Sequence, residues 1–312
     1  MKHPVVLALN PSIDAEWRVD GVRWEEKNNI HSERRWAGGK GINVARWLKH
    51  LGEYPELILP LGGASGRELA TLLRAEKISP TIIPLGQFPS SAGAGVGFSD
   101  HATRVNIIVS TRAQGQLRFN PLGPELTKRE WQAVVSRVRA ALRQASCLIL
   151  SGSLPRGVPV NAYAQLLRHA RAVKIPVLLD CDGPALAAAI AAKPFLVKPN
   201  DHELAQWAAA ARRSPSLRPG AFAMSKITRG WVLVSRGAKP AMLVNATHAI
   251  ELTATPPKLK PRNTVGAGDA LLAAVAQQII HSASPEAWLR AGLATGSAAT
   301  QLEAGRLPKR RC

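Results

Sequence analysis

Short apolar runs alternate with longer stretches of helical periodicity along the chain. The short runs are bounded by turn residues, as buried strands are. They lie at Val5–Leu9, Leu57–Pro60, Cys147–Leu150, Val177–Leu179, Phe195–Val197 and Val232–Val234. The helical stretches lie at 42–51, 66–77, 127–145, 160–173, 201–211 and 268–281. This alternation predicts right-handed βαβ units and a mostly parallel sheet covered by helices on both faces.

Two segments do not follow the alternation, residues 15–36 and about 88–120. Both have short alternating apolar and polar positions with turn residues between them. In the second, Val105–Val109 and Leu117–Phe119 are joined by Gln114–Gln116, which predicts a β-hairpin. We interpret the two segments as a small β-lid on the main sheet.

The composition is that of a folded protein. Of the 312 residues, 46% are hydrophobic and 20% are charged, and no long polar tract interrupts the apolar pattern, which excludes intrinsic disorder. The length fits one large α/β domain or two small ones. Because neither an internal repeat nor a long linker is visible, we expect one domain over residues 1–312, with a loop at 215–220.

Cysteine usage and the apolar segments indicate the compartment. Cys147, Cys181 and Cys312 have neither paired nor metal-like spacing, which is typical of a reducing environment. The first apolar run is too short for a signal peptide, and the alanine-rich stretch 185–192 is bounded by charged residues. We therefore expect a cytoplasmic protein with no membrane partner.

The chain is strongly basic. Lys and Arg total 41 against 21 acidic residues, a formal net charge of +20 that attracts anions of any kind. The densest clusters, Arg34-Arg35, Arg212-Arg213 and Lys309-Arg310-Arg311, lack the interleaved aromatics of single-strand binders. A generally basic surface is therefore favoured over nucleic-acid binding.

The last predicted helix opens on Gly266-Ala267-Gly268-Asp269. Unobstructed amides at a helix start, together with the helix dipole, form an anion site. Asp269 in the first turn can accept the proton of an attacking hydroxyl. We predict an anion hole at Gly266–Gly268 with Asp269 as catalytic base. For this segment alone, a simple helix cap is an equally good interpretation.

A second glycine-rich segment, Gly38–Ala45, precedes and opens the helix predicted at 42–51. Its glycines let a substrate approach the backbone, and Asn43 can hydrogen-bond a sugar hydroxyl. The spacing is neither that of a P-loop nor that of a dinucleotide fingerprint, so the segment by itself is a weak signal.

Polar motifs follow four of the predicted strands. They are Asn10–Asp14, Ser151–Ser153, Lys198–Asn200 and Ser235–Gly237. Ligands of such sheets bind beyond the carboxyl ends of the strands. The four motifs therefore predict one composite active site.

Taken together, the motifs resemble the ribokinase/PfkB carbohydrate kinase family. Gly38–Gly52 is similar to its first signature and Asn263–Ala274 to its second. Five further segments follow in the family's order: Leu9–Asp14, Thr103–Asn106, Ser151–Pro155, Lys198–Asn200 with Glu203, and Val234–Gly237. The resemblance implies a ribokinase-like α/β fold with a β-lid, ATP-dependent phosphorylation of a sugar, and Mg²⁺ as cofactor.

The resemblance also implies how the sugar is bound. Asp14, Gly39 and Asn43 would hold its hydroxyls, with Gly38 beside them. The phosphate that the substrate already carries would be bound by Arg104 and Arg118, in a pocket lined by Ser151, and Lys27 would reach a substrate or effector phosphate. A guanidinium suits a phosphate because its planar fork gives two parallel bonds. The alternatives are solvated charges on the lid for the arginines and an ordinary surface lysine for Lys27.

By the same resemblance, the nucleotide cleft would be lined by Lys198, Asn200, Ser235, Gly237 and Thr264. Asn200 and Glu203 would face the nucleotide's Mg²⁺, mostly through water. The alternative for Lys198–Asn200 is an ordinary strand-to-helix turn with Asn200 as the helix cap. Pro240 stands where the family has a glycine in the nucleotide loop, and it removes a backbone amide.

Within the family, the chain resembles the phosphosugar branch of minor 6-phosphofructokinase, 1-phosphofructokinase and tagatose-6-phosphate kinase. Leu61–Gly66, Arg118-Phe119 and Gly296–Thr300 are most similar to the first type, whereas Lys40 matches the other two. The expected reaction is phosphorylation of fructose 6-phosphate to fructose 1,6-bisphosphate. Tagatose 6-phosphate and fructose 1-phosphate are the alternative substrates.

The resemblance further implies a homodimer formed through the lid, although Asn29 replaces a basic residue that serves the neighbouring subunit in similar proteins. Two functions of other classes are a catalytically silent phosphosugar sensor and a nucleic-acid binder. Asp269 argues against the sensor, which needs no base, and the scattered charge argues against nucleic acid.

Overall fold

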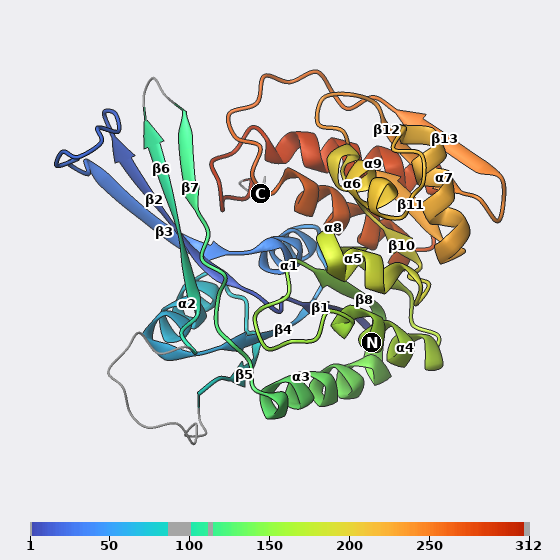
Figure 1. The fold of residues 1–312 in the computed structure, drawn as a ribbon, viewed down its shortest axis with the longest axis horizontal. Helices are drawn as coiled ribbons and strands as arrows, with labels where there is room; N and C mark the ends of the chain where they lie inside the picture. Colours follow the sequence, from blue (N-terminus) through green and yellow to red (C-terminus); the bar gives the residue numbers. More distant parts are fainter. Residues whose placement is uncertain (1, 87–100, 112–114, 309–312) are drawn as a thin grey trace.

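The computed structural model describes residues 2–86, 101–111 and 115–308. In these ranges the chain forms a large sheet between two layers of helices, with a smaller sheet projecting from one side (Figure 1). The large sheet has the order β13 (Ile250–Ala254), β12 (Ala241–Asn245), β11 (Trp231–Val234), β10 (Leu196–Val197), β9 (Val177–Asp180), β8 (Ala145–Ser151), β1 (His3–Leu7), β4 (Glu56–Leu61) and β5 (Thr81–Pro84). Every neighbouring pair is parallel except β11–β12 and β12–β13 at one edge.

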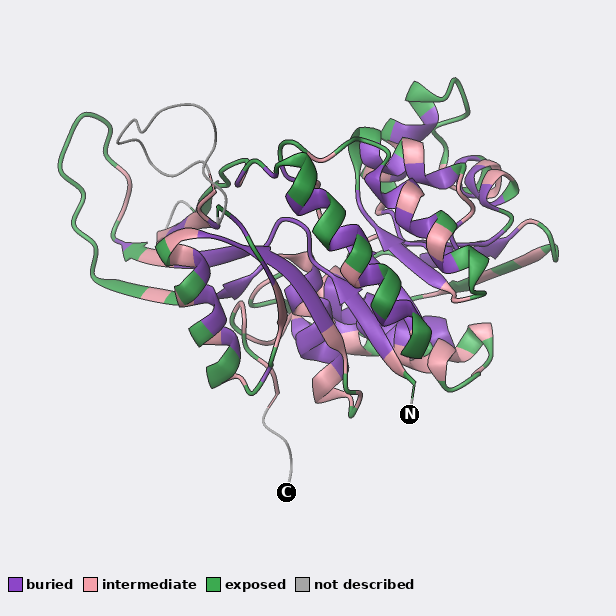
Figure 2. Cartoon of the chain, turned by 90° about the horizontal axis from the view of Figure 1, so that it is seen from below, coloured by how far each residue is buried: buried purple, intermediate pink, exposed green. Residues whose placement is uncertain are grey.

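Successive strand residues belong to two separate cores. Val5 and Leu7 pack into one core and Val6 into the other, as the twofold period of a strand buried on both faces requires. The first core is covered by α3 (Lys128–Ala141), α4 (Ala162–Ala172), α5 (Gly183–Ile190), α6 (Asp201–Ala210) and α7 (Leu217–Thr228). The second is covered by α1 (Lys40–His50), α2 (Gly63–Ala75), α8 (Ala267–Ile280) and α9 (Pro285–Ala299). Figure 2 shows the buried strands between helices whose outer sides are exposed.

The smaller sheet is the predicted lid. Its order is β3 (Ser32–Gly38), β2 (Ser12–Val19), β6 (Arg104–Thr111) and β7 (Gln116–Phe119). β2 and β6 are parallel, and the other two pairs are antiparallel, so the predicted hairpin is formed by β6 and β7. The lid strands begin earlier and end later than the predicted 15–36, which places Asp14 on the lid itself. Residues 87–100 of the second predicted segment lie outside the described residues.

The predicted α/β fold is confirmed, with differences at particular helices. The loop expected at 215–220 is wrong, because α7 begins at Leu217. Pro219 lies in its first turn, where a missing N–H costs nothing. The helix predicted over 127–145 ends as α3 at Ala141 and continues as a short 3-10 turn, Leu142–Gln144, before β8 begins. None of the described helices is long and apolar enough to cross a membrane.

Candidate active site

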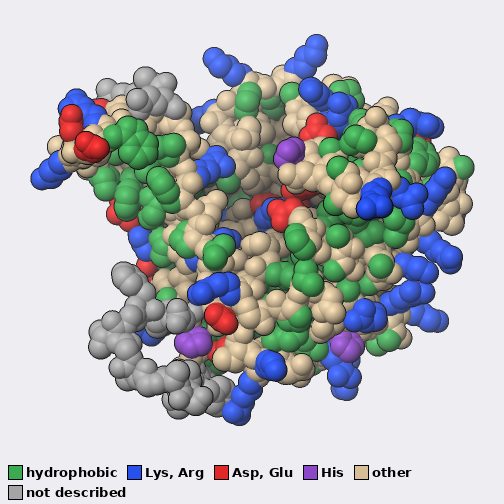
Figure 3. Space-filling model, viewed as in Figure 1, with side chains coloured by type: hydrophobic (Ala, Val, Ile, Leu, Met, Phe, Trp, Pro, Cys, Tyr) green, Lys and Arg blue, Asp and Glu red, His purple; other side chains and the backbone are tan. Residues whose placement is uncertain are grey.

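A cleft of about 710 Å³ lies between the lid and the carboxyl edge of the large sheet. Side chains from the lid strands, from the starts of α1 and α8, and from the segment before α6 line it. Figure 3 shows acidic and basic side chains together in this hollow. Of the four polar motifs predicted to form one site, three contribute residues to the cleft: Asn10–Asp14, Lys198–Asn200 and Ser235–Gly237. The fourth, Ser151–Ser153, contributes none of the described lining residues.

The start of α8 forms one wall of the cleft. Gly266 precedes the helix with φ +81°, a left-handed conformation that favours glycine. The first amides of a helix have no intrahelical acceptor, so those of the Gly266–Gly268 segment can bind an anion, although Ala267 N also donates a long bond to Thr264 O at 3.4 Å. A side chain built at Gly268 would come within 3.5 Å of Lys198 Nζ, which places a cation beside these amides.

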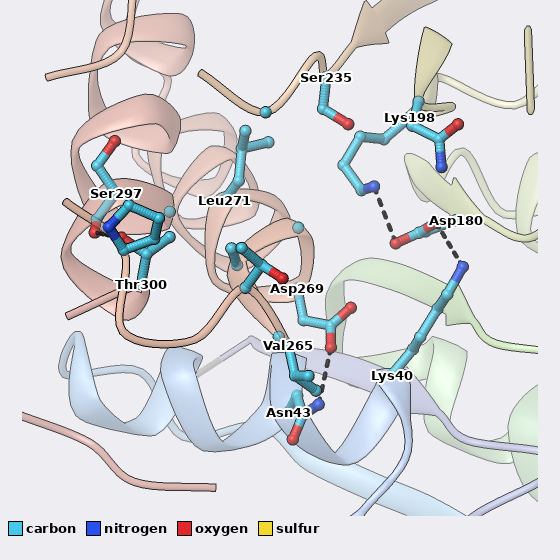
Figure 4. Close-up of a pocket in the computed structure, with 18 of the residues that line it drawn as sticks. Lys40, Asn43, Asp180, Lys198, Ser235, Val265, Asp269, Leu271, Ser297 and Thr300 are labelled. Atoms are coloured by element: carbon cyan, nitrogen blue, oxygen red, sulfur yellow. Dashed lines mark hydrogen bonds and ion pairs between the residues drawn. The ribbon is translucent and has the colours of Figure 1, made fainter. Parts of the chain in front are cut away.

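Asp269 lies in the first turn of α8 and is buried. Asn43 of α1 donates a hydrogen bond from Nδ2 to Asp269 Oδ2 at 2.8 Å (Figure 4). Burial, followed by the nearby charge of Asp180, raises the pKa of Asp269 from 3.8 to about 6, although Asn43, Lys198 and Lys40 oppose the shift. A carboxylate with such a pKa is ionised at neutral pH and remains a competent proton acceptor.

Asp180 is a central residue of the site that the sequence analysis missed. It is buried at the end of β9, with Oδ1 3.3 Å from Lys40 Nζ and Oδ2 3.1 Å from Lys198 Nζ (Figure 4). Lys40 was noted as a family variant but given no role. The signal that could have found Asp180 is its position immediately after the predicted strand Val177–Leu179, at the sheet edge where ligands bind.

On the lid, Asp14 faces the cleft from β2 and is buried. Its Oδ1 accepts hydrogen bonds from Ser12 Oγ at 2.9 Å and from Asn106 Nδ2 at 2.8 Å. Burial raises the pKa of Asp14 despite these bonds and the charge of Arg104. A side chain at Gly38 would strike the Asp14 carboxylate at 2.3 Å, so glycine is required there by packing.

The two lid arginines also face the cleft. Arg104 pairs with Ser12 in the β2–β6 ladder, and Arg118 pairs with Ile108 in the β6–β7 ladder. Because Arg104 and Ile108 are four residues apart on one strand, both arginines lie on the same face of the lid. Arg104 is anchored by bonds from Nη2 to Asn10 O at 2.9 Å and from Nη1 to Pro121 O at 3.2 Å. The hairpin therefore brings the two guanidinium groups to one cleft.

The predicted nucleotide residues line the other side of the cleft: Lys198, Asn200, Ser235, Gly237 and Thr264. Asn200 and Glu203 form a capping box at the start of α6, so the alternative interpretation of Asn200 as a helix cap also holds. Asn200 Oδ1 accepts from Glu203 N at 2.7 Å, and Glu203 Oε2 accepts from Asn200 N at 2.9 Å. Glu203 Oε1 remains on the cleft side, 3.8 Å from Lys40 Nζ.

Three residues that were predicted to bind the substrate are not among the described residues that line the cleft. Gly38 lies behind Asp14, Ser151 is buried at the end of β8, and Lys27 lies in the exposed connection between β2 and β3. Ser151 Oγ has no hydrogen-bond partner within the described part of the chain. Asn106, which does line the cleft, belongs to a motif that was recognised but was not assigned a role.

No group of three or more His, Cys, Asp or Glu side chains that could hold a metal occurs in residues 2–86, 101–111 and 115–308. The site therefore lacks an all-protein cage in that part of the chain. Glu203 Oε1 and the amide of Asn200 fit an ion held mainly by water and phosphate oxygens, as Mg²⁺ prefers.

Comparison with known proteins identifies the family. The model of the pfkB family of carbohydrate kinases matches residues 5–85 and 96–310. The chain is 33% identical over 307 residues to the ATP-dependent 6-phosphofructokinase isozyme 2 of Escherichia coli K12, covering 96% of this chain and 93% of that protein. It is 32% identical over 314 residues to a 1-phosphofructokinase of Xanthomonas campestris, covering 96% and 91%.

Similar solved structures support the same family assignment. The structure of Escherichia coli phosphofructokinase-2 with potassium superposes with a TM-score of 0.85 at 33% identity, covering 98% of this chain and 95% of that one. The complex of the same protein with fructose-6-phosphate gives a TM-score of 0.82 at 32% identity, covering 96% and 94%. The protein belongs to the pfkB family of carbohydrate kinases, and the expectation of a sugar-phosphate kinase from this family's phosphosugar branch is confirmed.

Proposed function

We propose that the protein transfers the γ-phosphoryl group of ATP to a hydroxyl of fructose 6-phosphate and produces fructose 1,6-bisphosphate. The observation that carries this proposal is the meeting of a buried carboxylate, Asp269, with an open helix start and two lysines in one cleft. Relatives of similar identity are named 6-phosphofructokinase and 1-phosphofructokinase, so fructose 1-phosphate is the second candidate substrate. Lys40 favours that alternative or tagatose 6-phosphate.

The cleft supplies each requirement of in-line phosphoryl transfer. Asp269 accepts the proton of the attacking hydroxyl, while Asp14 and Asn43 bind neighbouring hydroxyls of the sugar. The amides of Gly266–Gly268 and the Lys198 ammonium face the charge that develops on the transferred group. Because these groups are already held by the fold, little reorganisation is needed during the reaction.

The lid arginines support the proposal that the sugar substrate already bears a phosphate. Arg104 and Arg118 face the cleft from neighbouring strands, beside Asp14. Two guanidinium groups on one dianion form strong, often bidentate hydrogen bonds. We infer that the substrate phosphate lies between them, with the sugar extending toward Asp269.

A divalent ion, Mg²⁺ by preference, would neutralise the phosphates of ATP and be held from the protein side by Asn200 and Glu203 through water. Full activity in excess chelator would contradict this part of the proposal. Glu203→Gln is expected to raise the concentration of metal needed for half-maximal rate, while the amide can preserve the cap.

We also propose a cytoplasmic homodimer formed through the lid. Leu117 and Phe119 alternate with Arg118 on β7 and are 43% and 57% exposed, and Trp24 in the connection before β3 is 83% exposed. Leu117 and Phe119 lie on the same face of β7, and exposed apolar side chains that lie together are typical of an interface. A molar mass of one chain, measured by light scattering at working concentration, would contradict the dimer.

The test of the proposed reaction is Asp269→Asn, which retains the shape of the side chain and removes the base. Turnover with ATP and fructose 6-phosphate should fall about a hundredfold or more, with ATP binding nearly unchanged. Asp20→Asn, the same substitution in the exposed connection of the lid, serves as the control. Near-normal turnover of Asp269→Asn at saturating substrate would show that Asp269 is not the base.

Two binding measurements on the wild type separate the other functional classes. A phosphosugar sensor would bind fructose 6-phosphate without turnover, whereas a nucleic-acid binder would remain bound to double- or single-stranded nucleic acid at physiological salt. For a kinase with a generally basic surface, nucleic-acid binding should be lost as salt rises.

A further inference from the structure

Asn43 and Arg46 lie one turn apart on α1, and Arg46 is buried although it carries a full charge. Its guanidinium reaches Glu76, just after α2, through two bonds, Nε to Oε2 at 2.6 Å and Nη2 to Oε1 at 2.8 Å. Nη2 also donates to Ala37 O at 2.7 Å, and Nη1 donates to Asn43 Oδ1 at 2.7 Å. A continuous chain of hydrogen bonds therefore runs from Glu76 to Asn43.

The bond to Asn43 determines which end of its amide faces the cleft. Because Oδ1 accepts from Arg46, the amide nitrogen must point to the other side, where it donates to Asp269 Oδ2 at 2.8 Å (Figure 4). A flipped amide would place an oxygen against the Asp269 carboxylate and a nitrogen against the guanidinium. Both contacts would be unfavourable, so Arg46 selects one orientation.

We propose that Arg46, held by Glu76, is a positioning residue that fixes the Asn43 amide as a hydrogen-bond donor to Asp269. This inference rests on the proposed role of Asp269 as the catalytic base. The contact leaves Asp269 Oδ1 for the substrate hydroxyl, because Oδ2 is held by Asn43. Arg46 itself does not line the cleft, as far as the described residues define it.

Other charged groups also face Asp269, and they do not take part in the hydrogen bonds that link Glu76, Arg46 and Asn43. Asp180 approaches from β9, Lys198 from the segment after β10, and Lys40 from the start of α1. Like Lys198 and Lys40, Asn43 lowers the pKa of Asp269, but only Asn43 does so through a hydrogen bond whose orientation depends on Arg46. Loss of that bond should raise the pKa of the base while the other groups stay in place.

Three variants test the inference: Arg46→Met, which removes all donors, Arg46→Lys, which retains one donor group, and Glu76→Ala, which frees the guanidinium. Glu68→Ala is the matched control, because Glu68 forms the same two-pronged contact with Arg35 at 2.7 and 2.9 Å away from the cleft. The side chains of Glu76 and Glu68 are exposed to a similar degree, 29% and 39%. The pH dependence of kcat and KM is measured for each, together with thermal stability.

We expect Arg46→Met to shift the acid limb of kcat upward by about one to two pH units, the change that loss of one hydrogen bond to a charged carboxylate produces. KM for ATP should change little, whereas KM for the sugar should rise, because Asn43 is also proposed to bind a sugar hydroxyl. Arg46→Lys should lie between Arg46→Met and wild type, and Glu76→Ala should shift the acid limb in the same direction. Glu68→Ala should leave the limb unchanged. Where Arg46→Met does not fold, the other two variants decide.

An unchanged acid limb in destabilised variants would overturn the inference, since Arg46 would then serve folding alone. Failure of the proposed function gives a different result. If the wild type phosphorylates none of the sugars, the proposed reaction is wrong, but the carboxyl signal of Asp269 can still be titrated by NMR and assigned through Asp269→Asn. An Arg46→Met variant with the wild-type midpoint in that titration contradicts the inference; a raised midpoint supports it.

Discussion

The carboxylate of Asp180 and the ammonium of Lys198 form a buried ion pair, with Oδ2 and Nζ 3.1 Å apart and the side chains 1% and 6% exposed. The second oxygen of Asp180 lies 3.3 Å from Lys40 Nζ, so one carboxylate fixes two ammonium groups at the centre of the cleft. Under the proposed function, these are the cations that the phosphates of ATP would meet. The pair therefore links the stability of the fold to the chemistry of the site.

Removal of this carboxylate should be strongly destabilising. Asp180→Asn leaves Lys198 buried without its ion-pair partner, which costs about 3–5 kcal/mol in the free energy of unfolding. Burial alone would raise the pKa of Asp180, but the charges of Lys198 and Lys40 lower it below its usual value. The stabilisation is therefore present above the ordinary carboxyl pKa and is lost as pH falls below it.

Urea unfolding of wild type and Asp180→Asn at pH 7.5 and at about pH 3, below the ordinary carboxyl pKa of 3.8, tests this expectation. The difference in the free energy of unfolding should be large at pH 7.5 and smaller at the acid pH. A difference that is equal at both pH values would show that the charge of Asp180 is not the cause.

Asp269 should have the opposite effect on stability. Its pKa is raised from 3.8 to about 6, mainly by burial, so the native state binds the proton more tightly than the unfolded chain. Between these values stability falls as pH rises, and at neutral pH the ionised group costs about 3 kcal/mol. Asp269→Asn should therefore raise Tm at pH 7.5 but not at pH 4. A variant that is less stable than wild type at pH 7.5 would contradict this account.

The same pKa predicts the pH dependence of activity. A protonated Asp269 cannot accept a proton, so kcat/KM should fall as pH drops through about 6, the pKa of Asp269. The rate is measured from pH 5 to 9 and is corrected for the ionisation of the substrate phosphate groups over the same range. A profile that is flat down to pH 5 would rule out Asp269 as the group that controls the acid limb.

The fold could be predicted from the sequence because strand and helix signals are local. The twofold and 3.6-residue periods of the apolar positions were sufficient to predict the parallel sheet and its helices. The alternating pattern also predicted the hairpin on which Asn106 and Arg118 lie. Pro219 was misread as part of a loop, since a proline in the first turn of a helix has the same sequence signal.

The site was less completely predictable because it depends on contacts between distant segments. Asp180 had no motif of its own, and its importance comes from Lys40 and Lys198, which are 140 and 18 residues away along the chain. Arg46 lies inside a recognised signature, yet its bond to Asn43 becomes visible only in three dimensions. Residue types that act through a neighbour are not distinguished by sequence alone.

The lid arginines should discriminate between phosphorylated and unphosphorylated sugars. Arg104→Ala or Arg118→Ala should lower kcat/KM for fructose 6-phosphate at least about tenfold, since each removes charge-assisted bonds to the substrate phosphate. The weak activity on fructose should change little. An equal loss of kcat/KM on both sugars would indicate that the substitution loosened the lid and did not remove a contact with the substrate phosphate.

The central claim is that the cleft phosphorylates a sugar that already carries a phosphate, and a panel assay tests it most directly. Purified protein with ATP and Mg²⁺ is given fructose 6-phosphate, fructose 1-phosphate, tagatose 6-phosphate, fructose or ribose, and ADP release is measured with Asp269→Asn as the blank. The account predicts the highest kcat/KM for fructose 6-phosphate, with the other phosphosugars above the free sugars. A higher kcat/KM for fructose or ribose than for every phosphosugar would contradict it.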